Sequence, residues 1–368
     1  MALKLLQLKS AARPRSQRAQ MIAALQSMLE RLDEIDAECG TAFPLYAPAK
    51  RKRWQTSQGG SWIGGFWAGC WWLKAKYSEL EWDRAKAAEL CQRLRDKQTI
   101  DSCHRSFIFW YGAAFGEGLF DVAAGRGQAE AAAQRIAASY DAELQAIPLG
   151  TGLGAGERGR QTVVIDSIAP IIDLLLYGSD AGLAAIARRH ADTLIAACKE
   201  SSGAFHAEAR FLEGQFRAED DAGDWSRGQA WGMLGLARAA AYWGEPYLTA
   251  AEQACHYWRH SRPLPLPPNR LSEPVGLRDP SAAIIAALAM ASLSESSPRA
   301  GFWRRTARQT LMPVVQSSYL RNGAFDGCCY AIKPGQTALV ETPWGHFLLM
   351  SALDTMLEAE MASEPAAD

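Results

Sequence analysis

The segment Asp224-Trp225-Ser226-Arg227-Gly228-Gln229-Ala230-Trp231 ends a polar loop and at once begins an apolar helix that continues to Leu236. A segment that only filled a core would rarely carry so many hydrogen-bond donors. Arg227 has a planar fork of donors that suits a carboxylate, and Trp225 and Trp231 have flat faces that suit a sugar ring or packing. The segment therefore indicates a place for an acidic carbohydrate at the start of a helix.

The same pattern, a Gly-, Pro- or polar-rich loop that runs into a strongly apolar helix, occurs six times along the chain. The six segments are residues 62–73, 104–112, 163–176, 225–236, 278–288 and 341–350. Amphipathic helices are expected between them, at residues 83–95, 129–144, 181–199, 247–260 and 302–319. A helix that is apolar all round belongs inside a fold and an amphipathic one outside, so inner and outer helices alternate.

Six inner and six outer helices predict an all-α fold of the (α/α)6 toroid type, a six-hairpin barrel in a single domain. The first outer helix is expected at residues 19–39, the domain at 19–360, and poorly ordered tails at 1–18 and 361–368. An open α-solenoid is the alternative, but solenoid repeats share a consensus at a fixed period and these units do not. The loops that begin the inner helices should gather at one end, where we expect the active site.

Composition excludes several classes of function. The formal net charge of -1 provides no global field to hold nucleic acid or an anionic membrane. The eight cysteines are scattered without a CxxC pair, which favours free thiols and a reducing compartment. No signal-like or membrane-spanning run is present, so a cytoplasmic protein is expected. No metal spacing or phosphate loop occurs, and no cofactor is predicted.

Six short segments resemble the unsaturated glucuronyl hydrolases of glycoside hydrolase family 88 and, more faintly, family 105. They are Trp62-Ile-Gly-Gly-Phe-Trp-Ala-Gly69, Val164-Ile-Asp-Ser167, Gly203-Ala-Phe-His206, Trp225-Ser-Arg-Gly-Gln-Ala-Trp231, Arg278-Asp-Pro-Ser-Ala-Ala283 and Trp344-Gly345. The resemblance runs from about Trp54 to Leu357. It implies an enzyme that adds water across the C4=C5 double bond of a terminal unsaturated uronic acid, after which the ring opens and the sugar is released. The implied partner is a uronic-acid-containing oligosaccharide.

The resemblance implies that Asp166 is both the acid and the base of this reaction. An enol ether accepts a proton at carbon, and the same carboxyl group can then take a proton from the attacking water. The apolar residues that follow it, Ile168, Ile171 and Ile172, are expected to raise the pKa of Asp166. The alternative is that Asp166 only caps the helix, and the two roles are compatible.

The chain departs from the family pattern at two loops. Where the family has a second acidic residue, alignment on Phe107 places His104, and Asp101 is the alternative occupant if the loop is shifted. His104 could donate a proton or a hydrogen bond, although a lone His is often structural. In the last loop, His346 stands where the family commonly has Asp.

The resemblance implies a further set of substrate-binding side chains. They are Trp62, His206, Arg227, Gln229, Trp231 and Trp344. Arg227 is the candidate for the uronate carboxylate. Gln229 donates either to a sugar hydroxyl or to the neighbouring loop, and the sequence does not separate these.

Two other functions fit the same fold. A conventional glucuronidase needs two carboxyl groups across the scissile bond, which Asp101 or Asp224 would have to complete with Asp166. A non-catalytic protein that binds acidic glycans is suggested by the loss of the second acid at His104. Oligomeric state, parent polysaccharide, linkage and sulfation preference are left open by the sequence.

Overall fold

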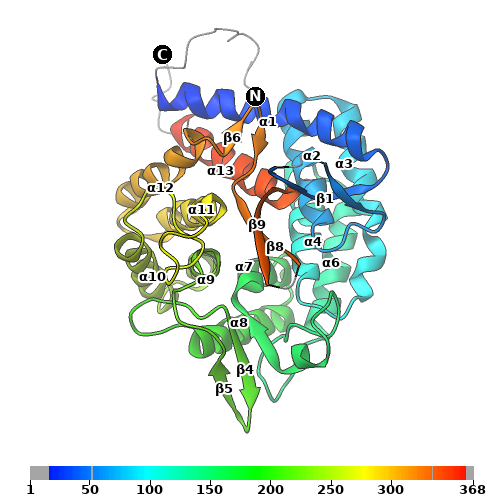
Figure 1. Cartoon of the computed structure of the whole chain (residues 1–368). Helices are drawn as coiled ribbons and strands as arrows, with labels where there is room; N and C mark the ends of the chain where they lie inside the picture. The colour runs from blue at the N-terminus through cyan, green and yellow to red at the C-terminus, as the bar shows by residue number, and fades with distance from the viewer. Residues whose placement is uncertain (1–15, 51–52, 334, 362–368) are drawn as a thin grey trace, which may run out of the picture.

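The computed structural model describes residues 16–50, 53–333 and 335–361 of the chain. Its inner helical segments are α2 (Gly64–Ser78), the run α4 (Arg105–Ile108), η2 (Phe109–Ala114) and α5 (Phe115–Phe120), α7 (Ile168–Leu175), α9 (Ser226–Trp243), α11 (Pro280–Ser296) and α13 (Pro343–Met361). The outer helices are α1 (Gln17–Cys39), α3 (Glu81–Arg93), α6 (Ala123–Ala137), α8 (Ala181–Cys198), α10 (Tyr247–Ser261) and α12 (Ala300–Val315). Figure 1 shows α7, α9, α11 and α13 around the centre with the outer helices around them.

The ring of inner helices is closed. Along the chain each inner segment packs on the next, and α13 packs against both α11 and α2. An open solenoid would leave its first and last units apart. The predicted all-α toroid is therefore confirmed, and the solenoid alternative is wrong.

Burial explains which helices lie inside. Almost every residue of α11 is buried, in keeping with its run of Ala, Ile, Leu and Met. On α8 the buried residues return every three or four positions: Leu183, Ala187, His190, Ala191, Leu194 and Cys198. A single apolar stripe covers the inner ring, while the charged face of the helix meets water.

Small antiparallel sheets, which the sequence analysis did not predict, join the helices at the loop end. One has the order β2-β1-β9-β8 and another β3-β4-β5, with a separate pair β6-β7. The strands are β1 (Phe43–Pro48), β2 (Gln55–Ser57), β3 (Thr162–Val164), β4 (Glu208–Leu212), β5 (Gln215–Ala218), β6 (Leu320–Arg321), β7 (Ala324–Phe325), β8 (Cys328–Lys333) and β9 (Gln336–Glu341). Such short strands contain too few residues for an alternation of apolar and polar side chains to be recognised in the sequence. In addition, β1 pairs with β9, which lies near the other end of the chain. In Figure 1, β8 and β9 cross in front of the inner helices.

Several expected boundaries are wrong by a few residues. The third inner helix was expected to begin at Asp166, but Asp166 lies in a 3₁₀ turn and α7 begins at Ile168. The first outer helix begins at Gln17, where the Oγ of Ser16 accepts a hydrogen bond from the N–H of Ala19 at 3.1 Å. Residue 361 ends α13, while the rest of the expected tails, residues 1–15 and 362–368, lies outside the described residues.

The second inner segment contains a π-helical turn, and such turns are frequent at functional sites. Within it, the carbonyl of Gly112 accepts a hydrogen bond from Nε1 of Trp72 at 2.8 Å. The start of this segment also lies very close to α2, because a Cβ on Gly65 would stand 2.4 Å from the Cα of Ile108. Glycine at position 65 therefore lets the segment that carries His104 approach the loop that carries Trp62.

Candidate active site

A cavity of about 110 Å³ lies where the N-terminal ends of the inner helices meet. It is lined by Trp62, Phe66, His104, Phe107, Asp166, Trp225, Arg227, Trp231, Tyr330 and Trp344. Six of the nine predicted site residues are among them, from five different inner segments. Most of the wall is aromatic, so a ligand here meets flat apolar faces and a few polar groups.

The polar centre of the cavity is a pair formed by Asp166 and His104. Nε2 of His104 lies 3.2 Å from Oδ1 of Asp166, and the side chains are 22% and 25% exposed. Asp166 sits in the 3₁₀ turn before α7, whereas the N-cap residue of that helix is Ser167, and no side chain caps it. The structure therefore places Asp166 at the cavity and not in the capping role that was its alternative.

The surroundings of His104 favour its protonated form. Burial by itself would lower the pKa of His104, but the charge of Asp166 and the hydrogen bond to it together outweigh burial and raise this pKa above its usual value. The imidazole also packs against Trp62 and Phe107, with ring centroids 6.3 Å and 5.6 Å away. His104 can therefore donate a proton or a hydrogen bond within the cavity.

Arg227 is held at the cavity by an ion pair and two indoles. Its Nη1 donates to Oδ2 of Asp279 at 2.5 Å, and Asp279 is fully buried. The guanidinium carbon lies 5.0 Å from the rings of both Trp225 and Trp344. Nε and Nη2 have no hydrogen-bond partner among the described residues, so part of the donor fork remains for a ligand.

Trp225 reaches the cavity because glycine follows three residues later. A Cβ on Gly228 would stand 2.4 Å from Cε3 of the Trp225 ring. The indole thus folds back over the first turn of α9 and lies next to Arg227. The Trp-x-x-Gly spacing in this segment has a steric reason that composition alone does not reveal.

Three predicted residues do not line the cavity: Asp101, His206 and Gln229. Asp101, the alternative to His104, accepts hydrogen bonds from the N–H and Oγ1 of Thr151 at 2.9 Å and 2.7 Å, and these bonds lower its pKa. It holds the glycine-rich loop, and the structure does not bring it to the cavity. His206 does not line the cavity either; its Nδ1 lies 2.6 Å from the carbonyl oxygen of Asp220, and its Nε2 lies 3.6 Å from Glu200.

Gln229, which was predicted to bind substrate, is also absent from the cavity lining. The side chain is fully buried, its Oε1 accepts from the N–H of Phe205 at 2.8 Å, and its Nε2 donates to the carbonyl of Gly203 at 2.9 Å. Of the two alternatives left open, the structure shows the bond to the neighbouring loop. Gln229 therefore fixes the loop 203–205 against α9.

We expect Gln229→Leu to lower the free energy of unfolding by about 2–5 kcal/mol, because Phe205 N–H and Gly203 C=O would be left buried without partners. Chemical denaturation measures this change. The KM of the folded fraction should change less than twofold, since the amide does not face the cavity. A large rise in KM without loss of stability would show that Gln229 contacts substrate.

His346, the second departure from the family pattern, lies outside the cavity. It is fully buried, and its Nε2 lies 2.8 Å from Oε1 of Glu341. Arg31 donates to both carboxylate oxygens of Glu341 at 3.0 Å. Burial would raise the pKa of Glu341, but the bonds to His346 and Arg31 outweigh it and lower the pKa to about 2. These three residues tie α1 to the start of α13.

Four cavity residues were not among the predicted site residues. Phe66, Phe107 and Trp225 lie in the segments that were singled out, and only their orientation was missing. Tyr330 comes from β8, a strand that the sequence analysis did not predict, and its ring packs against Tyr46 at 5.3 Å. The strand is only six residues long, and its sequence provides too short an alternation to have identified Tyr330.

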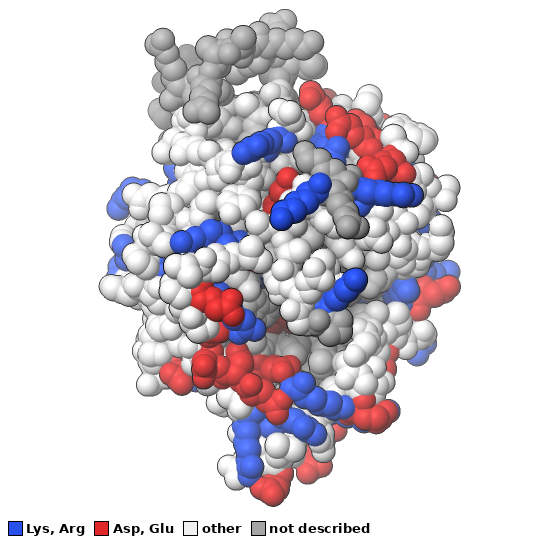
Figure 2. Space-filling view, viewed as in Figure 1, with Lys and Arg blue, Asp and Glu red and all other residues white. Residues whose placement is uncertain are grey.

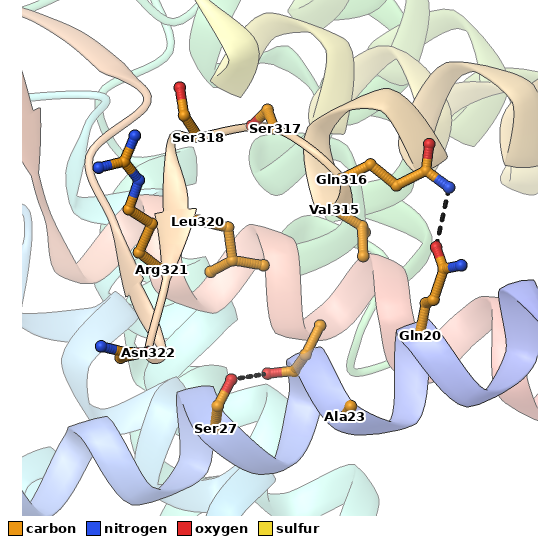
Figure 3. A pocket seen from close by; sticks show the side chains of 11 residues that line it. Gln20, Ala23, Ser27, Val315, Gln316, Ser317, Ser318, Leu320, Arg321 and Asn322 are labelled. Carbon is orange, nitrogen blue, oxygen red and sulfur yellow. Dashed lines mark hydrogen bonds between the residues drawn. The ribbon is translucent and has the colours of Figure 1, made fainter. Parts of the chain in front are cut away.

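A larger hollow, of about 840 Å³, lies between α1 and the segment 315–322 (Figure 3). Its walls are mainly amide, hydroxyl and alkyl side chains, and Figure 3 shows Gln316 donating to Gln20 across one end, at 2.8 Å. Among the described residues, no carboxylate and none of the predicted site residues line it. The smaller aromatic cavity is the better candidate because reactive groups converge there.

The charge around the candidate site is mixed. Figure 2 shows Lys and Arg in both the upper and the lower parts of the visible face, with one group of Asp and Glu at the upper right and another in the lower part. The positive groups that line the cavity are Arg227 and, when protonated, His104. Among the described residues, no three side chains of His, Cys, Asp or Glu gather as a metal site, and no helix is long and apolar enough to cross a bilayer.

The chain is a six-hairpin toroid of the (α/α)6 class, with an aromatic cavity that holds one acid and one arginine fork. No protein-family model matches the chain. The chain is similar to the unsaturated glucuronyl hydrolase of Bacillus sp. (strain GL1), with 24% identity over 356 residues that cover 85% of this chain and 90% of the relative. The resemblance predicted from the sequence is confirmed by this similarity.

Solved structures of unsaturated glucuronyl hydrolases have the same fold. One, described as specific for heparin, has a TM-score of 0.82 at 17% identity and covers 94% of this chain and 97% of its own. Another, a variant described with dGlcA-Glc-Rha-Glc, has a TM-score of 0.80 at 21% identity and covers 91% of this chain and 95% of its own. At these identities the structural likeness shows the fold.

Proposed function

We propose that this protein is a glycoside hydrolase of the unsaturated glucuronyl hydrolase type. It hydrates the C4=C5 double bond of an unsaturated uronic acid at the end of an oligosaccharide, and the sugar is released. The observation that carries this proposal is the cavity that combines the Asp166–His104 pair with the indole-clamped Arg227. The similarity to unsaturated glucuronyl hydrolases in sequence and fold supports it.

The chemistry needs one proton that leaves the enzyme and later returns. The π electrons of the double bond take the proton of the Asp166–His104 pair at C4, and a lone pair of the ring oxygen stabilises the cation at C5. Water then adds to C5 and gives a proton back to the carboxylate of Asp166. The resulting hemiketal opens, the bond to the leaving sugar breaks, and the pair is restored.

Arg227 binds the uronate carboxylate in this proposal. Its bond to Asp279 and its position between Trp225 and Trp344 fix the plane of the guanidinium, so the free donors are oriented before substrate arrives. Trp62, Trp231 and Tyr330 supply the faces against which the sugar rings pack. The carboxylate at C5 thus sits next to the carbon that receives water.

The direct test is an assay of the purified protein with an unsaturated disaccharide, followed by the loss of ultraviolet absorbance from the conjugated double bond. Loss of absorbance together with release of the second sugar supports the proposal. If the disaccharide binds but remains unchanged, the protein is the non-catalytic glycan-binding member that the loss of the second acid suggested.

A conventional glucuronidase is not favoured. Such an enzyme needs a second carboxyl group across the scissile bond, and Asp166 is the sole carboxylate that lines the cavity among the described residues. Asp224 accepts from Arg270 and from the N–H of Ser272, both at 2.8 Å, and lies outside the lining. Release of a sugar from a saturated glucuronide at a comparable rate would reverse this conclusion.

We expect activity to fall as pH rises through the pKa of His104. The pair keeps its proton below this pKa, and because Asp166 raises the pKa, the fall should lie above the usual value for histidine. His104→Gln retains a hydrogen-bond donor but cannot hold the proton, so this descending limb should be lost from the profile of kcat/KM against pH. If the descending limb of the pH profile were unchanged in His104→Gln, the proton needed for activity would belong to a group other than His104.

We further propose that residues 19–360 form one catalytic domain and that the protein acts in the cytoplasm. All eight cysteines lie in the described residues as free thiols, seven of them buried, which suits a reducing compartment. Fractionation of the source cells tests the location.

A further inference from the structure

The toroid holds a second cavity, of about 260 Å³, at the end opposite to the candidate active site. Its lining includes Asp173 of α7, Arg238 of α9, Ser292 of α11 and Ser351 of α13. On α9, Arg238 follows Trp231 of the active-site cavity by seven residues, and on α13 Ser351 follows Trp344 by the same interval. Two helical turns separate each pair by about 10 Å along the axis.

A layer of aromatic rings separates the two cavities. Phe66 and Phe107 line the active-site cavity, whereas Tyr111 and Phe347 line the far one. The rings of Phe66 and Tyr111 stack at 4.7 Å, and those of Tyr111 and Phe347 lie 5.1 Å apart. A ligand in the far cavity would therefore meet an aromatic wall and would not touch Asp166.

The far cavity contains polar groups that the fold leaves unused. Nε of Arg238 donates to Oδ1 of Asp173 at 2.8 Å, and Arg238 also hydrogen-bonds to Tyr242. The hydroxyl oxygens of Ser292 and Ser351 are shielded from solvent and also lack partners within the described chain. Buried hydroxyls without partners cost stability, so these groups point to a bound molecule that supplies the missing hydrogen bonds.

The charges that line the far cavity and its volume limit the kind of molecule that can bind there. Asp173 and Arg238 neutralise each other, and the exposed carboxylate of Glu295 stands at the mouth of the cavity, so an anion is disfavoured. The volume lies below the roughly 300 Å³ at which pockets for drug-sized ligands begin. We propose that the far cavity is a second ligand site for a neutral, polyhydroxylated molecule of monosaccharide size.

The direct experiment is a crystal structure of the whole protein soaked with D-glucose, and a second soaked with D-glucuronate as the anionic probe. The expected result is one glucose molecule in the far cavity, with hydroxyls bonded to Ser292 and Ser351. Ordered water alone in that cavity overturns the proposal. If glucuronate binds there and glucose does not, the proposal that the ligand is neutral is overturned.

Calorimetric titration with glucose tests the same site in solution. Ser292→Leu and Ser351→Leu fill the cavity from two helices, and each should weaken glucose binding at least tenfold. Ser294→Ala is the matched control on α11, because the Ser294 hydroxyl donates to the carbonyl of Ala291 at 2.6 Å and does not line the cavity. Equal affinities in all three variants would exclude the far cavity as the binding site.

Turnover of an unsaturated disaccharide separates this inference from the proposed function. The three variants should keep wild-type kcat and KM, since none of these residues lines the active-site cavity. Thermal unfolding confirms that each is folded before affinity is compared. Trp225→Ala, which opens the active-site cavity, should retain glucose binding in the far one; a loss there would place the observed binding in the active site.

Discussion

Replacing Asp166 with Asn should lower kcat on an unsaturated disaccharide by about 10³-fold. General acid–base groups contribute about 10²- to 10⁴-fold, and in this cavity one carboxylate serves both proton transfers. Asn keeps the shape and a hydrogen bond to His104 but cannot take a proton from water. Single-turnover absorbance traces at saturating substrate measure the chemical step directly.

Asp101→Asn is the matched control for this experiment, because Asp101 is an aspartate of a neighbouring loop that bonds Thr151 outside the cavity. We expect it to keep kcat within about threefold of wild type. If Asp166→Asn retained full activity, the assignment of Asp166 would be wrong. If both variants lost activity equally, the cause would lie in the stability of the loops, which thermal unfolding would reveal.

Replacing Arg227 with Lys should raise the KM for an unsaturated disaccharide about 10- to 100-fold, the equivalent of roughly 1.5–3 kcal/mol for a hydrogen bond to a charged group. An ammonium ion is a point charge and cannot hold Asp279 and the substrate carboxylate in one plane at once. It also loses the stacking of the guanidinium on Trp225 and Trp344. Initial rates over a range of substrate concentration measure the change.

Arg270→Lys is the control, since Arg270 pairs with Asp224 at 2.8 Å on a more exposed site outside the cavity lining. Its KM should stay within twofold of wild type. A wild-type KM in Arg227→Lys would remove Arg227 from carboxylate binding. Arg227→Met, by contrast, should destabilise the protein by about 3–5 kcal/mol, because Asp279 would be left fully buried and unpaired.

Much of the candidate site could be predicted from the sequence because each loop precedes an apolar helix. Asp166, His104, Arg227 and the three tryptophans expected there all line one cavity. The predicted residues that do not line the cavity belong to the same loops, but their side chains bond elsewhere. Gln229 lies two residues after Arg227 on α9, and that spacing points it toward Phe205 and the interior of the loop.

Asp101 and Tyr330 illustrate the two limits of such predictions. Proximity in sequence made Asp101 a candidate, yet Thr151, fifty residues away, provides the bonds that hold it. Tyr330 enters the cavity on a strand whose partner β9 is paired in turn with β1 near the start of the chain. Neither the bonds to Thr151 nor the pairing of these strands leaves a pattern in the neighbouring sequence.

The sequence by itself determined the closed ring of alternating helices, since apolar and amphipathic periodicities are local properties that each helix carries along its own length. It also determined which loops lie at the end of the ring that holds the active-site cavity. The tertiary structure alone decided that His104 bonds Asp166, that Asp279 orients Arg227, and that Gln229 faces away from the cavity. These contacts join residues 24 to 62 positions apart and depend on side-chain direction, which hydrophobic periodicity does not encode.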